Sequence, residues 1–66
     1  MTGHDEVMSQ FQLMQTFGRN GDFANARVCL DSAKRIWESL AEVDETVRAN
    51  LGFYEKNYNH FSAMIK

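Results

Sequence analysis

Residues 16–23 read TFGRNGDF, and this stretch decides the fold because it interrupts an otherwise regular chain. Glycine-rich sequences of this kind form phosphate-binding loops, β-hairpin turns or turns between helices. A phosphate-binding loop needs a preceding strand and a Lys-Ser or Lys-Thr pair after its last glycine, whereas Asp22 and Phe23 follow Gly21 here. Asn-Gly predicts a β-hairpin only between alternating strands, and the apolar residues on both sides recur every three or four positions. We therefore predict a turn between two helices.

On the N-terminal side of this turn, helical spacing predicts a first helix over residues 4–18. Its apolar residues are Val7, Met8, Phe11, Met14 and Phe17. Thr2 and Asp5 have the spacing of a capping box, although Asp5 could itself be the N-cap. Gly18 is well placed to end this helix in the left-handed conformation that glycine adopts at low cost. Asp22 then caps the next helix.

On the C-terminal side, the apolar stripe is unusually regular. It comprises Phe23, Ala26, Leu30, Ala33, Trp37, Leu40, Val47, Leu51, Tyr54, Tyr58, Phe61 and Ile65. Asp44 breaks it where the pattern requires an apolar side chain. Because the helix dipole favours an acidic residue in the first turn of a helix, we predict that Asp44 is the N-cap of a third helix. The chain is then an all-α bundle of three helices, over about residues 4–18, 22–41 and 45–65. Residues 41–44 contain neither glycine nor proline, so a short helix packed on one long helix remains the alternative.

The composition is that of a small globular domain. We expect residues 1–66 to form a single helical domain. A chain of this length buries only about 60% of the surface that its unfolded form exposes. An apolar share of 44% is typical of a globular rather than a disordered protein. Cys29 is the only cysteine, so a disulfide cannot stabilise the small core.

A second copy of the chain can supply the missing burial, and we expect a homodimer. Apolar Cys29, Ile36 and Val43 widen the first half of the stripe, which is typical of a bundle core. Past Asp44 the stripe narrows, and this second half could pack against another copy.

Composition and charge also indicate the compartment and the class of partner. A single thiol and the lack of a signal peptide point to the reducing cytoplasm. The longest apolar runs have two or three residues, so we expect no membrane span. A net charge of −2 and a pI of about 5.5 make nucleic acid an unfavourable partner.

One basic group is the best candidate for nucleic-acid binding. It consists of Arg27, Lys34 and Arg35. Asp31 lies four residues from both arginines, and Glu38 lies four residues from Lys34, so weak ion pairs along a solvated helix face explain the same residues. A small helical DNA-binding regulator is therefore kept as the alternative function.

The residues that could carry catalysis or bind a metal are isolated from one another. His4, Cys29 and His60 lack the spacing of metal ligands, and we interpret them as a terminal, a core-edge and a surface residue. Nucleophilic catalysis needs a base beside the nucleophile, and an apolar environment makes a thiol such as Cys29 inert. We therefore predict that the protein is not an enzyme and has no cofactor.

Phe53 is the most informative single residue, because it follows Gly52 and lies off the apolar stripe. A glycine inside a helix costs about 1 kcal/mol relative to alanine, and the close approach of another helix is one reason for it. We predict a second, shallower contact face for a partner protein or another subunit. This face consists of Ala49, Gly52, Phe53, Lys56 and His60. The sequence leaves open whether a helix of the same chain covers Phe53 instead.

Residues 10–37 resemble one tetratricopeptide repeat. The matching residues are the turn Gly21, Asp22 and Phe23, the small-large-small series Ala26, Leu30 and Ala33, and apolar Leu13 and Phe17. Met14 and Glu38 depart from the pattern, where a small residue and a proline are usual. A solenoid needs about three stacked repeats, so this resemblance implies a helical hairpin and no more.

The stretches MTGHDEVMSQFQLMQ (residues 1–15) and VRANLGFYEKNYNHF (residues 47–61) carry a second resemblance. They are similar to the short early proteins of lambdoid bacteriophages that are encoded between the exonuclease and excisionase genes. This resemblance implies a small regulatory protein in the host cytoplasm that contacts an unidentified host or phage protein. It implies an effect on phage development or host physiology, and it transfers no catalytic residue.

Overall fold

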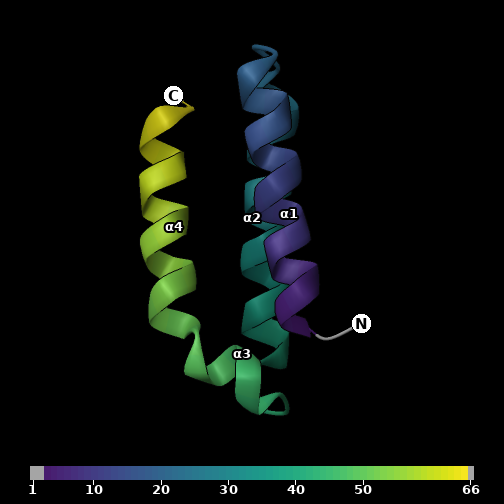
Figure 1. The fold of residues 1–66 in the computed structure, drawn as a ribbon, viewed down its shortest axis with the longest axis vertical. Coiled ribbons are helices and arrows are strands. Elements are labelled where there is room, and N and C mark those ends of the chain that lie inside the picture. Colours follow the sequence, from purple (N-terminus) through teal and green to yellow (C-terminus); the bar gives the residue numbers. More distant parts are fainter. Residues whose placement is uncertain (1–2, 66) are drawn as a thin grey trace.

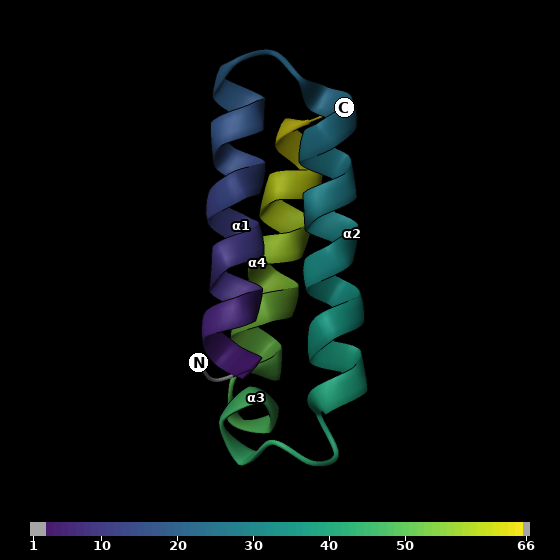
Figure 2. The same cartoon turned by 90° about the vertical axis from the view of Figure 1, so that its right-hand side faces the viewer.

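A computed structural model describes residues 3–65, which form an all-α bundle. The helices are α1 (Gly3–Arg19), α2 (Phe23–Leu40), α3 (Glu45–Ala49) and α4 (Leu51–Met64). The three longer helices run side by side, and the short α3 lies across one end of the bundle (Figures 1 and 2). The predicted three-helix bundle is confirmed, with its third helix divided at Asn50.

The turn between α1 and α2 is a Schellman motif. The amide of Asp22 donates to the carbonyl of Phe17 at 2.9 Å, and the amide of Gly21 donates to that of Gly18 at 3.1 Å. Gly21 has a φ of 78°, the left-handed conformation that this motif requires. The prediction that Gly18 takes this conformation is therefore wrong, because α1 continues past it. Asp22 caps α2 as predicted, accepting from the amide of Asn25 at 3.3 Å.

The first residue of α1 packs closely against the far end of α2. A Cβ atom added to Gly3 would lie 2.5 Å from Leu40 Cδ1 and 2.9 Å from Asp44 Oδ2, so a larger residue would displace these two side chains. Asp5 lies within the first turn of α1 rather than before it. The capping role predicted for Thr2 falls outside the described residues.

Asp44 separates α2 from α3, as predicted. Residues 41–43 form a turn, and Asp44 Oδ1 then accepts from the amides of Thr46 at 3.0 Å and Val47 at 3.2 Å. Two donors at the start of α3 are thereby satisfied. The alternative of one long helix over residues 22–65 is not formed.

Two side chains fix the bend on either side of α3. Arg48 donates through Nε to the carbonyl of Ala41 at 2.9 Å and through Nη2 to that of Glu42 at 2.8 Å. Asn50 donates through Nδ2 to the carbonyl of Thr46 at 2.7 Å. Asparagine side chains compete with the helix backbone in this way, and α3 ends at this position.

The core lies where the three longer helices meet. Its buried residues are Val7, Phe11, Met14, Ala26, Cys29, Leu30, Ala33, Trp37, Val47, Tyr54 and Ile65. Helices α1 and α2 run close together because Ala26 and Ala33 leave room for the facing helix, whereas α4 approaches α2 at fewer points. Two residues predicted in the core are exposed, Phe23 by 47% and Val43 by 79%. Phe23 lies at the start of α2, and Val43 lies in the turn after α2. The neighbouring helices do not extend far enough to cover either residue.

Candidate functional site

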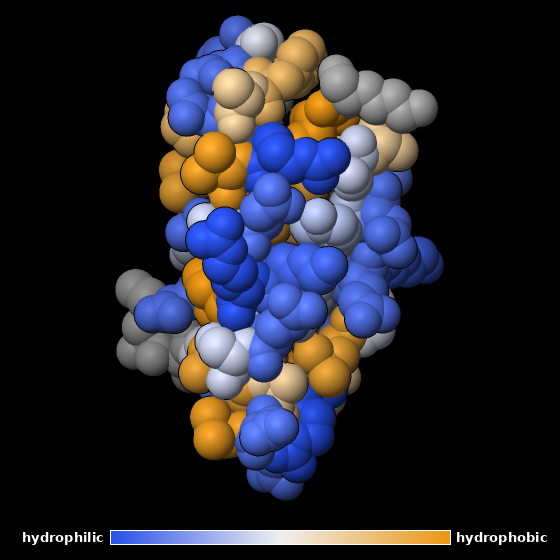
Figure 3. Space-filling view, turned by 180° about the vertical axis from the view of Figure 1, so that it is seen from behind, coloured by the Kyte–Doolittle hydropathy of each residue, from blue (hydrophilic) through white to orange (hydrophobic). Residues whose placement is uncertain are grey.

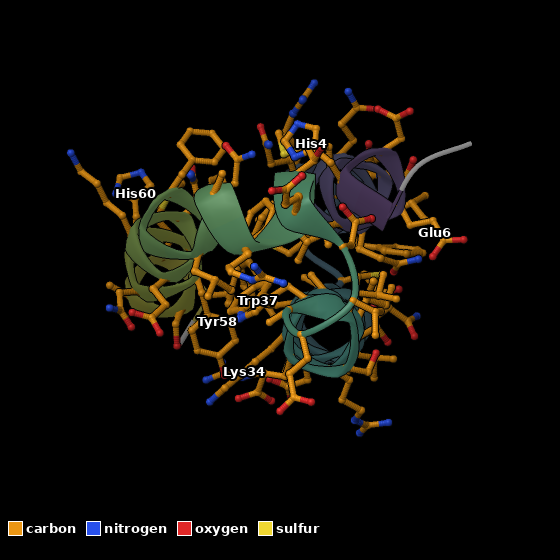
Figure 4. The ribbon with its side chains drawn as sticks, turned by 90° about the horizontal axis from the view of Figure 1, so that it is seen from below. His4, Glu6, Lys34, Trp37, Tyr58 and His60 are labelled. Atoms are coloured by element: carbon orange, nitrogen blue, oxygen red, sulfur yellow. The ribbon has the colours of Figure 1, made fainter. Side chains whose placement is uncertain are left out.

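Tyr54 fixes α4 against the α1–α2 hairpin. It is fully buried, and its ring stacks on Trp37 of α2 at 5.4 Å between centroids and on His4 of α1 at 5.7 Å. Trp37 points into the space between the three longer helices (Figure 4). We call these three residues the aromatic stack. These large rings fill the space between α4 and the α1–α2 hairpin.

A hydrogen bond adds to the aromatic stack. The hydroxyl of Tyr54 lies 2.6 Å from Nδ1 of His4. Burial raises the pKa of Tyr54, and the negative charge of Asp44 raises it further, so the hydroxyl keeps its proton at neutral pH. The interpretation of His4 as a merely terminal residue is wrong, because its ring links α1 to α4.

A polar clasp joins α2 to α4 beside the aromatic stack. The hydroxyl of Tyr58 donates to Asp31 Oδ1 at 2.9 Å, and Lys34 Nζ lies 5.2 Å from the centroid of the Tyr58 ring. Arg27 Nη1 donates to Ser62 Oγ at 3.0 Å. The hydrogen bond to Asp31 raises the pKa of Tyr58, and burial adds to this effect. Lys34 and Tyr58 lie together at one side of the bundle (Figure 4).

The polar clasp accounts for most of the basic group considered for nucleic acid. Arg27 and Lys34 both contact side chains of α4, and Arg35 is exposed on α2. Seen from behind, where α2 is nearest, the middle of the surface is largely hydrophilic (Figure 3). Two of the three cations therefore have a role in packing the helices, and acidic Asp31 lies between them.

The contact face predicted from the sequence is exposed at every position. Four of its residues lie on α4, and we call them the α4 outer face: Gly52, Phe53, Lys56 and His60. His60 points away from the bundle (Figure 4). Ala49 is the last residue of α3, so the break at Asn50 separates it from the other four.

Phe53 and Gly52 are the unusual members of the α4 outer face. Phe53 is 48% exposed, and its ring meets the edge of Tyr54 at 6.2 Å between centroids. The open alternative, burial of Phe53 by a helix of the same chain, is not realised within residues 3–65. A Cβ atom added to Gly52 would have nothing within 4 Å. No helix in that range approaches this glycine closely, so its backbone is free for an outside partner.

The end of α1, the start of α2 and the end of α4 lie at the end of the bundle farthest from α3 (Figure 1). Side chains from these segments line an apolar groove. Its volume is about 210 Å³. We call it the end groove; its lining residues are Met14, Gln15, Gly18, Arg19, Phe23, Phe61, Met64 and Ile65. Sequence reasoning missed it, because the groove depends on where three helices end. The feature of the sequence that could have indicated the groove is Phe23, a large apolar residue directly after the N-cap Asp22.

The residues with reactive groups are separate from one another. Cys29 is buried, and burial raises the pKa of its thiol, which disfavours the reactive thiolate. Between residues 3 and 65, no three His, Cys, Asp or Glu side chains are placed to hold a metal ion. None of the helices in the same range is long and apolar enough to cross a bilayer.

A scan against protein-family models and searches of curated proteins and of solved structures found no match for this chain. Two features of the chain's own surface bear on its function, the α4 outer face with exposed Phe53 and the end groove.

Proposed function

We propose that this is a non-enzymatic regulatory protein that acts by binding another protein through the α4 outer face. The exposure of Phe53 carries the proposal. Aromatic residues are enriched in protein interfaces, where a few anchor residues provide most of the binding free energy. Phe53 is 48% exposed, and Gly52 beside it leaves its backbone open to a partner.

The packing of α4 supports the same proposal. The aromatic stack and the polar clasp hold the helix from its inner side, so Phe53 is presented on a fixed element. Binding through a preorganised surface loses less conformational entropy than binding through a mobile one. Lys56 lies one turn from Phe53 on the same face, so the α4 outer face combines an aromatic ring with a polar group.

We also propose that the protein is encoded by a phage and acts in the cytoplasm, as the sequence implies. Its resemblance to phage early proteins supports a host or phage protein as the partner. A single buried thiol agrees with the reducing cytoplasm. DNA binding is the weaker alternative, because Arg27 and Lys34 contact α4.

Site-specific photo-crosslinking tests the proposal. A photoreactive phenylalanine analogue is placed at position 53 of the full chain, and separately at position 13 as a matched control. Leu13 is 47% exposed and lies on α1. We expect protein adducts from position 53 and none, or far fewer, from position 13. Equal adducts from both positions, or none from position 53, would contradict the proposal.

A further inference from the structure

We propose that a second copy of this chain occupies the α4 outer face. The two copies pack antiparallel through α4, and Phe53 of each copy enters the end groove of the other. This inference rests on the proposed function, because it names the partner of the same face. It joins the exposed ring of Phe53 to the apolar end groove.

Phe53 and one wall of the end groove lie on the same helix, α4. Phe53 and Met64, a lining residue of the groove, are 11 residues apart, which is close to three full turns of an α-helix. They therefore point in nearly the same direction, about 16 Å apart along the axis. Gly52 and Ala63 have the same spacing, and all four residues are exposed. Helix α4 thus carries a large and a small exposed residue side by side near each end.

Two-fold symmetry brings Phe53 of each copy to the groove end of α4 in the other copy. In an antiparallel pair of α4 helices, the start of one helix faces the end of the other. With the axis midway along this stripe, Phe53 lies beside Met64 of the partner subunit, at the end groove, and Gly52 lies beside Ala63 of the partner subunit. Both contacts form at once, and the interface closes at two copies.

The shape and chemistry of the groove suit a phenyl ring. Its walls are largely apolar, with Met14, Phe61 and Ile65 among them. Gly18 leaves one wall open, since a Cβ atom there would meet only Ile65 Cγ2, at 3.8 Å. Methionine side chains adapt readily and pack well against aromatic rings. The ring of Phe53 would lose its remaining contact with water there.

The polar residues of the stripe and its area fit the same arrangement. Lys56 faces His60 of the partner subunit, and an imidazole nitrogen can accept a hydrogen bond from an ammonium group. A standard interface buries about 800 Å² per partner, roughly a fifth of this chain's exposed surface of 4373 Å². The 14 residues of α4 extend for about 21 Å. An interface of this size has to extend along the full length of α4 and include the groove.

Sedimentation velocity of the full chain across micromolar concentrations tests the inference. The wild type is expected to show a reversible monomer–dimer equilibrium. Phe53→Ala removes the ring, and Gly18→Leu fills the groove while it keeps the ring. Each variant loses both symmetric contacts, so each should raise the dimer dissociation constant at least about tenfold. Leu13→Ala, which has a matched exposure, should leave that constant unchanged.

Mixing the two variants gives the sharpest test. The groove of Phe53→Ala is intact, and so is the ring of Gly18→Leu, so a mixed dimer regains one of the two contacts. We expect an equimolar mixture to dimerise more tightly than either variant alone. Circular dichroism checks that both variants fold, and Gly18→Met replaces Gly18→Leu if the latter does not. Equal association in the mixture and the separate variants would overturn the inference.

The remaining outcomes separate this inference from the proposed function. A wild-type chain that stays monomeric, with adducts from position 53 to a different protein, overturns the inference alone. A monomer without such adducts overturns both. A dimer that both variants leave unchanged also overturns the inference, because its interface then lies elsewhere.

Discussion

Phe53 and Tyr54 are neighbours in the sequence with opposite surroundings. One step along a helix turns the side chain by about 100°, so Tyr54 faces the core while Phe53 faces outward. Tyr54 is fully buried between Trp37 and His4, whereas Phe53 is 48% exposed. The two residues should therefore respond differently to substitution, Tyr54 through stability and Phe53 through association.

The Tyr54→Phe variant tests the hydrogen bond between Tyr54 and His4. It keeps the ring in the aromatic stack but removes the hydroxyl 2.6 Å from His4 Nδ1. We expect the free energy of unfolding to fall by about 0.5–1.5 kcal/mol, measured by urea denaturation. In a His4→Ala background the same change should matter much less. Equal losses in the two backgrounds would show that the hydroxyl and His4 are not coupled.

The tyrosines also predict a dependence of stability on pH. Folding raises the pKa values of Tyr54 and Tyr58 above the ordinary value of 10.0. Above pH 10 the unfolded chain therefore binds fewer protons than the folded one, and stability falls as pH rises. Urea denaturation between pH 8 and 11 should show this fall. The fall should be shallower in a Tyr54→Phe/Tyr58→Phe variant, and parallel curves for the two proteins would contradict the account.

At the scale of the elements, Asp44 decides where α3 begins. Asp44→Ala removes two hydrogen bonds to the first turn, from Thr46 and Val47. The expected loss is about 1 kcal/mol, the usual effect of removing an N-cap. Asp44→Asn, which can still cap the helix, should keep most of the stability. Thermal unfolding followed by circular dichroism measures both changes, and equal losses would argue against a capping role.

Two glycines of the helices predict stability changes of opposite sign. Gly52→Ala has open space around the new Cβ atom, so better helix propensity should stabilise the chain by up to about 1 kcal/mol. Gly3→Ala would place its Cβ 2.5 Å from Leu40 Cδ1, so it should be destabilising. Urea denaturation below the concentration of any dimer measures both. Stabilisation by Gly3→Ala would show that α1 and α2 do not meet as described.

Local signals in the sequence predicted most of these elements. The Asp22 and Asp44 caps could be predicted directly, because Asp22 follows the turn at Gly21 and Asp44 occupies an apolar register. The break at Asn50 could not, since it depends on an amide that bonds to the carbonyl of Thr46. The end of α1 was predicted wrongly: we assigned the left-handed position to Gly18, whereas Gly21 takes the positive φ. Apolar spacing alone does not show how far α1 continues past Gly18.

At the scale of the whole molecule, the sequence predicted surfaces better than it predicted contacts between distant residues. The periodicity of α4 correctly put Phe53 off the buried stripe. It could not show that His4 reaches Tyr54, because 50 positions separate them and only the assembled bundle brings them together. The end groove was missed for the same reason, since α1, α2 and α4 all contribute to it.

The central claim of this account is that α4 packs on the hairpin through Tyr54 and leaves Phe53 outside. A NOESY spectrum of the monomer tests it most directly. We predict cross-peaks from the ring protons of Tyr54 to those of both Trp37 and His4, and none from Phe53 to Trp37. Cross-peaks between Phe53 and Trp37, with none between Tyr54 and Trp37, would contradict it.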